Sequence, residues 1–373
     1  MNIAIQAADL DAVRIDGTRV YILHMLRHFG ALALTDTFSI YHRTKFNPAL
    51  TPPFFQNYKV KAMDFPCLWT QTRFAWELFS NTPDVLWMPM HNLPFMRRSK
   101  MRTVVTVHDL AYKYFPEYFP KKDVLELNVL GDMAIRNADH LIAVSESTKR
   151  DILTWYPSVK AESITVVYHG FDAEIFSKER NPIEEARVRK LLRIDGEYLL
   201  YSGAIQPRKN LKVLIDAFAI LKQSGKASDV KLVLAGGDAW LSEHVHEKVA
   251  VSPFREDILM PGQIGFDDLG HLMRGARIYV FPSLYEGFGI PILEALASRV
   301  PVITADNSSL REVGGDAAEY FDASDAKALS EKIREVLSDE SLRAGMIARG
   351  LEQIKKFSWE KCARETLHVL LDN

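Results

Sequence analysis

A glycine-containing turn late in the chain lies between two glutamates whose chemistry suits hydroxyl groups. Glu286 precedes the turn Gly287-Phe288-Gly289, and Glu294 follows seven residues after Glu286 in an expected helix. Glycines let the backbone approach a ligand closely, and N–H groups where a helix begins bind anions. The two carboxylates can accept hydrogen bonds from a sugar or a ribose in one pocket. The other interpretation is an ordinary tight connection between a strand and a helix, with both glutamates in solvent.

A second segment places two cations where another helix is expected to begin. Arg208 and Lys209 precede the apolar helical period that starts at Leu211. Cations in a first helical turn oppose the helix dipole, at a cost of roughly a few tenths of a kcal/mol each. A diphosphate would offset that cost. A solvated basic turn explains the pair equally well.

Both segments follow short apolar runs, and such runs alternate with amphipathic stretches along the whole chain. This alternation is typical of βαβ units and predicts an α/β protein with doubly wound parallel sheets. The expected strands are 3–5, 38–41, 85–88, 103–107, 140–144, 164–168, 198–202, 230–235, 258–260, 278–281 and 300–304. Ligands bind beyond the carboxyl ends of strands in such sheets, so two domains facing each other would form a cleft there.

The strands form two series, and each series predicts one domain. We place the hinge near 169–172, so that residues 1–172 form the first domain and 173–357 the second. A charged, weakly patterned segment over 177–195 introduces the second series. The last helical pattern is interrupted near Ser358, which can cap a new helix. That helix, 358–373, is expected to return to the first domain.

Composition excludes several classes of protein. The 373 residues carry 46 Lys and Arg against 48 Asp and Glu, a formal net charge of −2, so no global field attracts nucleic acid. Cys67 and Cys362 provide neither a disulfide framework nor metal-ligand spacing, which favours a reducing cytoplasm. No basic leader and no apolar run of about 18 residues is present, so we expect neither export nor a membrane span.

Taken together, these motifs resemble the retaining nucleotide-sugar glycosyltransferases of family 4, which have the GT-B fold of two Rossmann-like domains facing across a cleft. The resemblance rests on Gly203-x4-Arg208-Lys209-Asn210-Leu211, on Glu286-x7-Glu294 and on the segment 308–318. Segments 107–110, 115–120 and 143–151 resemble the mannosyltransferase-like branch that builds bacterial surface polysaccharides such as lipopolysaccharide.

The resemblance implies roles for donor-binding residues in the second domain. Arg208 and Lys209 would neutralise the donor diphosphate, together with the backbone amides of Gly287-Phe288-Gly289. Glu286 would lie by the donor sugar as a catalytic residue, and Glu294 would hold the ribose. Many relatives have proline where this chain has Arg311.

Two further residues belong to the first domain. His108 follows the expected strand 103–107, and the resemblance implies that it contacts the donor sugar during catalysis. Gly17 lies in the turn after the first strand, where the resemblance implies close approach of phosphate or acceptor. This turn lacks the paired glycines of many relatives.

We expect no metal and no other cofactor beyond the nucleotide-sugar donor. Asp9-Leu10-Asp11 matches the Asp-x-Asp pattern that holds manganese in other glycosyltransferases, but the remaining motifs belong to a metal-independent fold. His244-x-His246 is a weaker pattern still. No carboxylate stands out as a nucleophile, so we adopt the same-face attack thought to operate in the family as a hypothesis for retention.

The acceptor side is open between two interpretations. Residues 46–79 are rich in aromatic side chains, and 94–102 mixes bases with apolar groups. If exposed, they would let the first domain rest on an anionic membrane and take a lipid-linked glycan. Otherwise the aromatics are core and the bases form a solvated loop.

The sequence therefore predicts a cytoplasmic, metal-independent, retaining hexosyltransferase, with peripheral contact at the inner face of the membrane left open. The favoured donor is GDP-mannose, bound by the second domain, and the acceptor is a glycan or lipid-linked glycan, bound by the first. The alternatives are a UDP-sugar as donor, a nucleotide-sugar epimerase, or a non-catalytic nucleotide-sugar-binding protein on the same fold. No nucleic-acid partner is expected.

Overall fold

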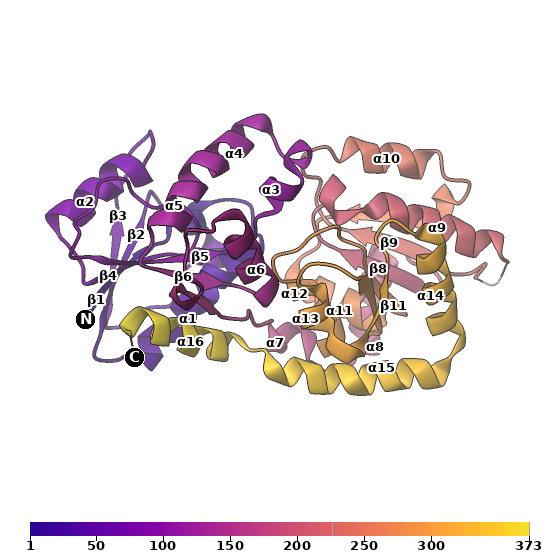
Figure 1. Cartoon of the computed structure of the whole chain (residues 1–373). Coiled ribbons are helices and arrows are strands. Elements are labelled where there is room, and N and C mark those ends of the chain that lie inside the picture. The colour runs from indigo at the N-terminus through magenta and orange to yellow at the C-terminus, as the bar shows by residue number, and fades with distance from the viewer. Residues whose placement is uncertain (226, 373) are drawn as a thin grey trace. The chain divides into compact units, whose positions relative to one another are not determined.

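The computed structural model describes residues 1–225 and 227–372, which fall into two compact units (Figure 1). The first unit comprises residues 1–114, 121–170 and 358–373, and the second comprises 115–120 and 171–357. The sequence-derived boundary put 115–120 in the first domain, whereas this segment packs with the second unit. Trp240 of the second unit holds this segment. Its indole N–H donates to the Tyr118 carbonyl, and its ring centroid lies 5.8 Å from that of Phe119.

The first unit contains a seven-stranded, all-parallel sheet in the order β3-β2-β1-β4-β5-β6-β7. Its strands are β1 (Asn2–Gln6), β2 (Thr37–His42), β3 (Tyr58–Ala62), β4 (Val85–Met88), β5 (Arg102–Val107), β6 (His140–Ala143) and β7 (Ile164–Val166). Its helices are α1 (Gly17–Leu32), α2 (Ala75–Ser80), α3 (Ala111–Tyr114), α4 (Lys121–Glu126), α5 (Asp132–Asn137), α6 (Glu146–Trp155) and α16 (Trp359–Leu371). The central strands are buried on both faces, as βαβ crossovers require.

The second unit contains a six-stranded, all-parallel sheet in the order β10-β9-β8-β11-β12-β13. Its strands are β8 (Tyr198–Ser202), β9 (Lys231–Ala235), β10 (Ile258–Gly262), β11 (Ile278–Phe281), β12 (Val302–Ala305) and β13 (Ala318–Phe321). Its helices are α7 (Ala173–Phe176), α8 (Pro182–Leu191), α9 (Leu211–Gln223), α10 (Glu243–Ala250), α11 (Phe266–Gly275), α12 (Ile290–Ala297), α13 (Leu310–Gly314), α14 (Ala326–Ser338) and α15 (Glu340–Gln353). The two parallel sheets confirm the predicted α/β fold class.

Two strands and one helix differ from the sequence-based expectation. Strands β3 and β13 were not predicted: both are short edge strands whose apolar residues are interrupted by charged ones. The charged segment 177–195 contains the regular helix α8. The Asn181 side chain caps α8, and Pro182 begins it, so local start signals outweigh its weak apolar pattern.

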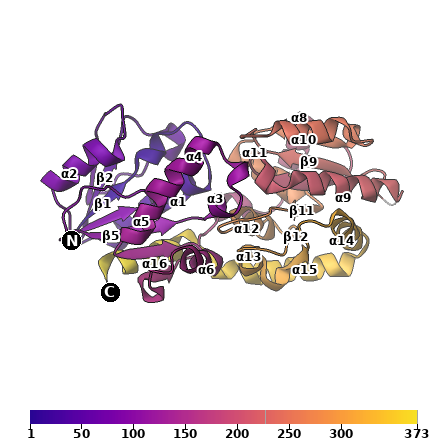
Figure 2. The same ribbon diagram turned by 45° about the horizontal axis from the view of Figure 1, so that its top comes forward.

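The last helix, α16, packs against α1 in the first unit (Figure 1 and Figure 2). Ser358 caps α16 by accepting a hydrogen bond from the Lys361 N–H at 3.1 Å. Trp359 then stacks on His24 of α1, with ring centroids 4.7 Å apart. Gly170 makes room for this packing, because a Cβ there would lie 2.1 Å from the Trp359 nitrogen.

Candidate active site

The glycine turn of the second unit lies between β11 and α12, at the carboxyl end of a central strand. Gly289 caps α12 with a φ of 117°, a backbone conformation that L side chains rarely adopt. Pro291 lies in the first turn of α12, where its missing N–H costs no hydrogen bond. A sharp turn at the carboxyl edge of the sheet therefore leads directly into a helix N-terminus.

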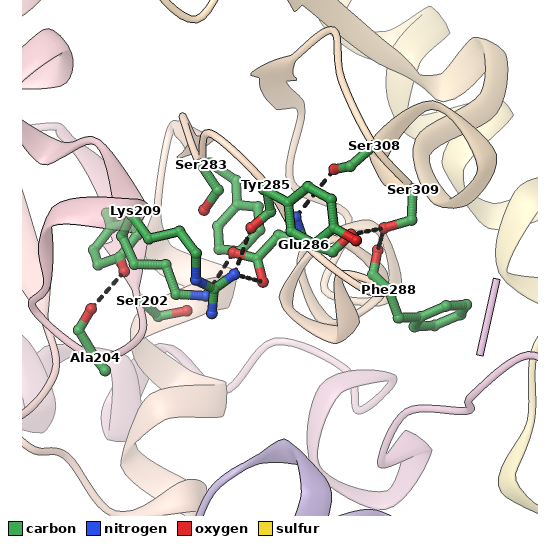
Figure 3. A network of polar contacts seen from close by, with 12 residues as sticks. Ser202, Ala204, Lys209, Ser283, Tyr285, Glu286, Phe288, Ser308 and Ser309 are labelled. Atoms are coloured by element: carbon green, nitrogen blue, oxygen red, sulfur yellow. Dashed lines mark hydrogen bonds and ion pairs between the residues drawn. The ribbon is translucent and has the colours of Figure 1, made fainter. Parts of the chain in front are cut away.

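Two serines hold this turn in place (Figure 3). The Glu286 N–H donates to the Ser308 hydroxyl at 3.0 Å, and the Ser309 hydroxyl reaches the carbonyls of Glu286 and Phe288 at 2.9 and 2.6 Å. The sequence analysis assigned neither serine a role. Both serines lie in segment 308–318, which carries part of the family resemblance, but only the folded structure shows that they support the glycine turn.

Glu286 forms an ion-pair cluster with the two predicted cations (Figure 3). Its carboxylate lies 2.5 Å from the Lys209 Nζ and 3.2 Å from an Arg208 guanidinium nitrogen. The Arg208 guanidinium also donates to the Tyr285 carbonyl. All three charged side chains are nearly buried, with exposed fractions of 11–13%. The cluster carries one net positive charge and lies beside the glycine turn.

The electrostatics of the cluster keep Glu286 ionised. Burial alone would raise its pKa, but the charges of Lys209 and Arg208 outweigh burial and lower the pKa to about 2. The carboxylate is therefore a hydrogen-bond acceptor at any physiological pH. It offsets one of the two positive charges of Lys209 and Arg208.

Arg208 and Lys209 are not in the first turn of α9, where the sequence analysis placed them. They form a separate 3-10 turn, Pro207–Lys209, and Asn210 breaks it from α9 with a φ of 57°. The Asn210 side chain anchors this break by donating to the carbonyls of Pro282 and Ala323 at 3.1 and 2.7 Å. The turn thus aims both cations at Glu286, which lies 77 residues or more further along the chain.

Glu294 is in a different environment from Glu286. It lies on α12, and burial, with the nearby Asp172 carboxylate, raises its pKa to about 8. Glu294 is thus mainly protonated near pH 7, and its carboxyl group can donate as well as accept a hydrogen bond. The two glutamates present opposite protonation states to a ligand.

His108 follows β5 directly in the first unit, at the carboxyl end of that strand. Its Nε2 lies 2.8 Å from the Pro89 carbonyl, and its ring lies 5.1 Å from Tyr21 and 5.5 Å from His169. Burial lowers the pKa of His108, so the ring is neutral at pH 7. Because a carbonyl only accepts, Nε2 carries the proton and Nδ1 is left as an acceptor.

Gly17 is the first residue of α1 in the same unit. Asp16 caps the helix by accepting from the Arg19 N–H at 3.3 Å and also pairs with the Arg19 guanidinium. Gly17 is exposed at this helix N-terminus. His108 therefore directly follows β5, whereas Gly17 begins α1, beyond the 3-10 helix Ala8–Asp11 that follows β1.

Each unit thus holds one feature of the sequence-based site: the second has a cation–carboxylate cluster on a glycine turn, and the first has a neutral histidine after a strand. Together with two all-parallel sheets, these features define a glycosyltransferase of the GT-B fold. Comparison with known proteins agrees. Residues 182–353 match the family described as Glycosyl transferases group 1, and residues 15–175 match Glycosyltransferase Family 4.

The curated relatives place the chain in this family. It is 32% identical over 298 residues to O-antigen chain mannosyltransferase B of Escherichia coli, covering 80% of this chain and 76% of the relative. It is 26% identical to O-antigen chain mannosyltransferase RfbU of Salmonella typhimurium, covering 66% of this chain and 63% of that protein. The chain belongs to the family 4 glycosyltransferases.

Solved structures share the fold. Anabaena Alr3699/HepE in complex with UDP-glucose superposes over the full length of both chains with a TM-score of 0.77 at 16% identity. WaaG, a glycosyltransferase involved in lipopolysaccharide biosynthesis, covers 99% of both chains with a TM-score of 0.75 at 16% identity. Across the residues that the structure describes, no helix has the length and apolar character to cross a membrane.

Proposed function

We propose that this glycosyltransferase transfers mannose from GDP-mannose to a growing surface glycan, with retention at the anomeric carbon and without a metal ion. The observation that carries the proposal is the cluster of Arg208, Lys209 and Glu286 on the glycine turn. Departure of the nucleotide builds negative charge on the diphosphate. Two preorganised cations can stabilise that charge by several kcal/mol, in place of a metal.

Binding of the donor exchanges partners within the cluster. When the diphosphate contacts Lys209 and Arg208, Glu286 is released from part of its ion pairing and can accept hydrogen bonds from hydroxyl groups of the donor sugar. Glu294, largely protonated because its pKa is about 8, can donate to one ribose oxygen and accept from another. The helix N-terminus behind Gly289 adds N–H groups to the anion site.

Retention follows from attack on the face that the leaving group vacates. In this hypothesis a departing phosphate oxygen takes the proton of the acceptor hydroxyl, so no carboxylate nucleophile is needed. His108, neutral and with Nδ1 free of the proton, can accept a hydrogen bond from a sugar hydroxyl. The names of the two curated relatives support mannose, whereas the UDP-glucose complex of the structural neighbour makes a UDP-sugar the alternative donor.

The test combines binding with turnover. Thermal shifts are measured with GDP, UDP, ADP and their sugar conjugates, with and without a chelator, because a ligand of the native state raises the melting temperature. We expect selective stabilisation by GDP and GDP-mannose that the chelator leaves unchanged. An NMR spectrum of the product then reports its anomer. Selective stabilisation by UDP and its sugar conjugates would instead identify a UDP-sugar as the donor. A product with the inverted anomer would refute retention.

We further propose that the first unit binds an anionic membrane that carries the lipid-linked acceptor. The aromatic residues of segment 46–79 differ in burial. Tyr58, Trp69 and Phe74 lie in the core, whereas Trp76 is 61% exposed and Phe79 is 41% exposed. Phe95, Met96 and Arg98 are also exposed, and Arg98 lies 4.7 Å from the Phe79 ring centroid. Exposed aromatic rings beside a guanidinium suit a surface of anionic headgroups.

Flotation with vesicles tests this surface. We expect the protein to float with phosphatidylglycerol vesicles at low salt, to float less at high salt, and to stay unbound with phosphatidylcholine alone. The double variant Trp76→Ser with Arg98→Ser should lose flotation. The variant Trp155→Ser, at an exposed aromatic of α6, serves as the control. Absence of binding to anionic vesicles at low salt would refute the proposal.

A further inference from the structure

The loop 306–309 connects β12 to α13 and contacts the glycine turn. Its last two residues, Ser308 and Ser309, hold the backbone of that turn through their hydroxyl groups. Ser309 donates to carbonyls, whereas Ser308 accepts from the N–H of Glu286. The half-buried residue before them, Asn307, determines how the Ser308 hydroxyl is oriented.

The side-chain amide of Asn307 has a single orientation. Its Nδ2 lies 3.0 Å from the carbonyl of Ser283, a fully buried residue that follows β11, and its Oδ1 lies 3.0 Å from the Ser308 hydroxyl. A carbonyl only accepts hydrogen bonds, so the amide nitrogen faces Ser283 and the amide oxygen faces Ser308. Exchanging the two ends of the amide would lose the bond to Ser283.

This orientation fixes the direction of the Ser308 hydroxyl. A hydroxyl has one proton and an amide oxygen only accepts, so Ser308 donates its proton to Asn307. A lone pair of Ser308 Oγ is then left for the Glu286 N–H, 3.0 Å away. We call the sequence of bonds from Ser283 through Asn307 and Ser308 to Glu286 the relay. Each of its bonds has one possible direction.

The backbone of Ser308 is in an uncommon conformation. Its φ is 44°, in the left-handed region that residues other than glycine rarely adopt. Residues in such conformations persist where the surrounding structure imposes them, and they cluster at functional sites. Glycine would adopt this φ without strain. What serine adds at this position is the hydroxyl group that the relay uses.

The ends of the loop are fixed by Arg311, at the position where many relatives have proline. Its guanidinium forms a two-pronged ion pair with Asp306, at 2.8 and 2.6 Å, and lies 4.3 Å from the ring centroid of Tyr320 in β13. The Asp306 N–H also donates to the Phe321 carbonyl at 2.9 Å. A bidentate pair adds geometric specificity. The loop that carries Asn307 is therefore held against the end of β13.

The relay and the two cations act on different parts of Glu286. Lys209 and Arg208 contact its carboxylate, whereas Ser308 contacts its backbone N–H. Figure 3 shows Glu286 between Lys209 on one side and Ser308 on the other. Loss of the relay would therefore leave the cations in place and release the backbone that carries the carboxylate.

We infer that Asn307 is a positioning residue of the transfer reaction, because it orients the Ser308 hydroxyl that holds Glu286 at the donor sugar. This role rests on the proposed function, which places Glu286 beside that sugar. Asn307 acts through Ser308 on Glu286 and not on the cations. It should therefore affect the transfer step and leave binding of the nucleotide intact.

Steady-state kinetics on the full chain tests this role. The donors are GDP-mannose and, as the alternative, UDP-glucose, with methyl α-mannopyranoside as a simple acceptor. We expect Asn307→Ala to lower kcat about tenfold or more, because small displacements of a catalytic group are costly. Its affinity for the free nucleoside diphosphate, measured by calorimetry, should be the same as that of the unmodified chain or higher.

A second variant guards against misfolding of the first. Ser308→Gly removes the hydroxyl and relieves the left-handed backbone, so we expect kcat to fall at least as far as in Asn307→Ala without a lower melting temperature. The double variant should be no more than about twofold slower than Ser308→Gly alone. The reason is that Asn307 has no hydroxyl left to orient once Ser308 is replaced.

Asn181→Ala is the matched control. Asn181 lies in the same unit, and its side chain accepts from the N–H groups of Ile183 and Glu184 at the start of α8. Its replacement also removes an amide with two hydrogen bonds, but outside the relay. We expect this variant to melt at a lower temperature with an unchanged kcat.

The outcomes are distinct. Lower kcat in Asn307→Ala and Ser308→Gly, with intact nucleotide affinity and no further loss in the double variant, supports the positioning role. An unchanged kcat in either single variant overturns it, as does a double variant whose loss is the product of the single losses. A fall in nucleotide affinity that matches the fall in kcat of Asn307→Ala also overturns it. If the unmodified chain releases neither GDP nor UDP from these donors, the proposed function fails, and this role fails with it.

Discussion

Replacing Glu286 by glutamine should lower the stability and turnover of the enzyme while raising its affinity for a nucleoside diphosphate. The substitution keeps the shape of the side chain and removes only its charge. Arg208 and Lys209 then face each other without the carboxylate that lies 3.2 and 2.5 Å away. Two nearly buried cations that lose this counter-charge destabilise the protein, and a bound diphosphate would restore it.

The structure gives the size of the effect. The fall in the Glu286 pKa from its ordinary value of 4.5 to about 2 corresponds to about 3 kcal/mol, since one pKa unit is worth about 1.36 kcal/mol. The folded-state pKa is the lower one, so this stabilisation is complete above pH 4.5 and is lost as the pH falls towards 2. We expect Glu286→Gln to unfold about 2–3 kcal/mol more easily near pH 7, and the difference to shrink below pH 4.5.

Urea denaturation between pH 3 and 7 measures the stability difference, and isothermal titration calorimetry measures GDP affinity. We expect GDP to bind the variant several-fold more tightly while sugar transfer falls by about a hundredfold or more, because Glu286 is expected beside the donor sugar. A variant that is as stable as the unmodified chain at pH 7, or that binds GDP more weakly, would refute the partner-exchange argument.

Three further predictions concern the same unit. Lys209→Met should weaken GDP binding about tenfold by calorimetry, because a charge-assisted bond to phosphate is lost, whereas Lys212→Met, exposed on α9, should not. Ser309→Ala should lower the free energy of unfolding by about 1–3 kcal/mol in urea, because two buried carbonyls lose their donor. Glu294→Gln should become progressively more stable than the unmodified chain as the pH rises from 4.5 to 8, because the raised pKa of about 8 makes ionisation in the folded state costly; equal thermal melting profiles across that range would contradict this.

Local sequence signals were sufficient for much of the fold. Strands β8 and β11 lie where the apolar runs predict, and Ser358 caps α16 as its position before an apolar period indicates. These signals succeed because central parallel strands must be apolar on both faces and helix starts need a side-chain acceptor. Edge strand β3 alternates two lysines with apolar residues and buries only Tyr58, so it has no buried apolar face to mark it as a strand.

The candidate site was predictable in its residue types and only partly in its geometry. The sequence indicated that Arg208, Lys209 and Glu286 serve one donor, but the pairing between them joins positions far apart in the chain and exists only in the folded sheet. The opposite protonation of Glu286 and Glu294 also depends on neighbours from other elements, such as Asp172. Periodicity and spacing carry no information on such contacts.

The ion-pair cluster also explains how two desolvated cations can be buried on one turn. Arg208 and Lys209 are almost fully buried, and two like charges in that position would be costly without a counter-charge. Glu286 provides it, and Ser308 fixes the backbone of Glu286 by accepting its N–H. The carboxylate therefore holds both cations in place, and the cluster keeps one net positive charge, which the proposed function assigns to a diphosphate. In the proposed mechanism the same side chain turns to the donor sugar once phosphate oxygens replace it, so that Glu286 would link binding of the nucleotide to readiness for transfer.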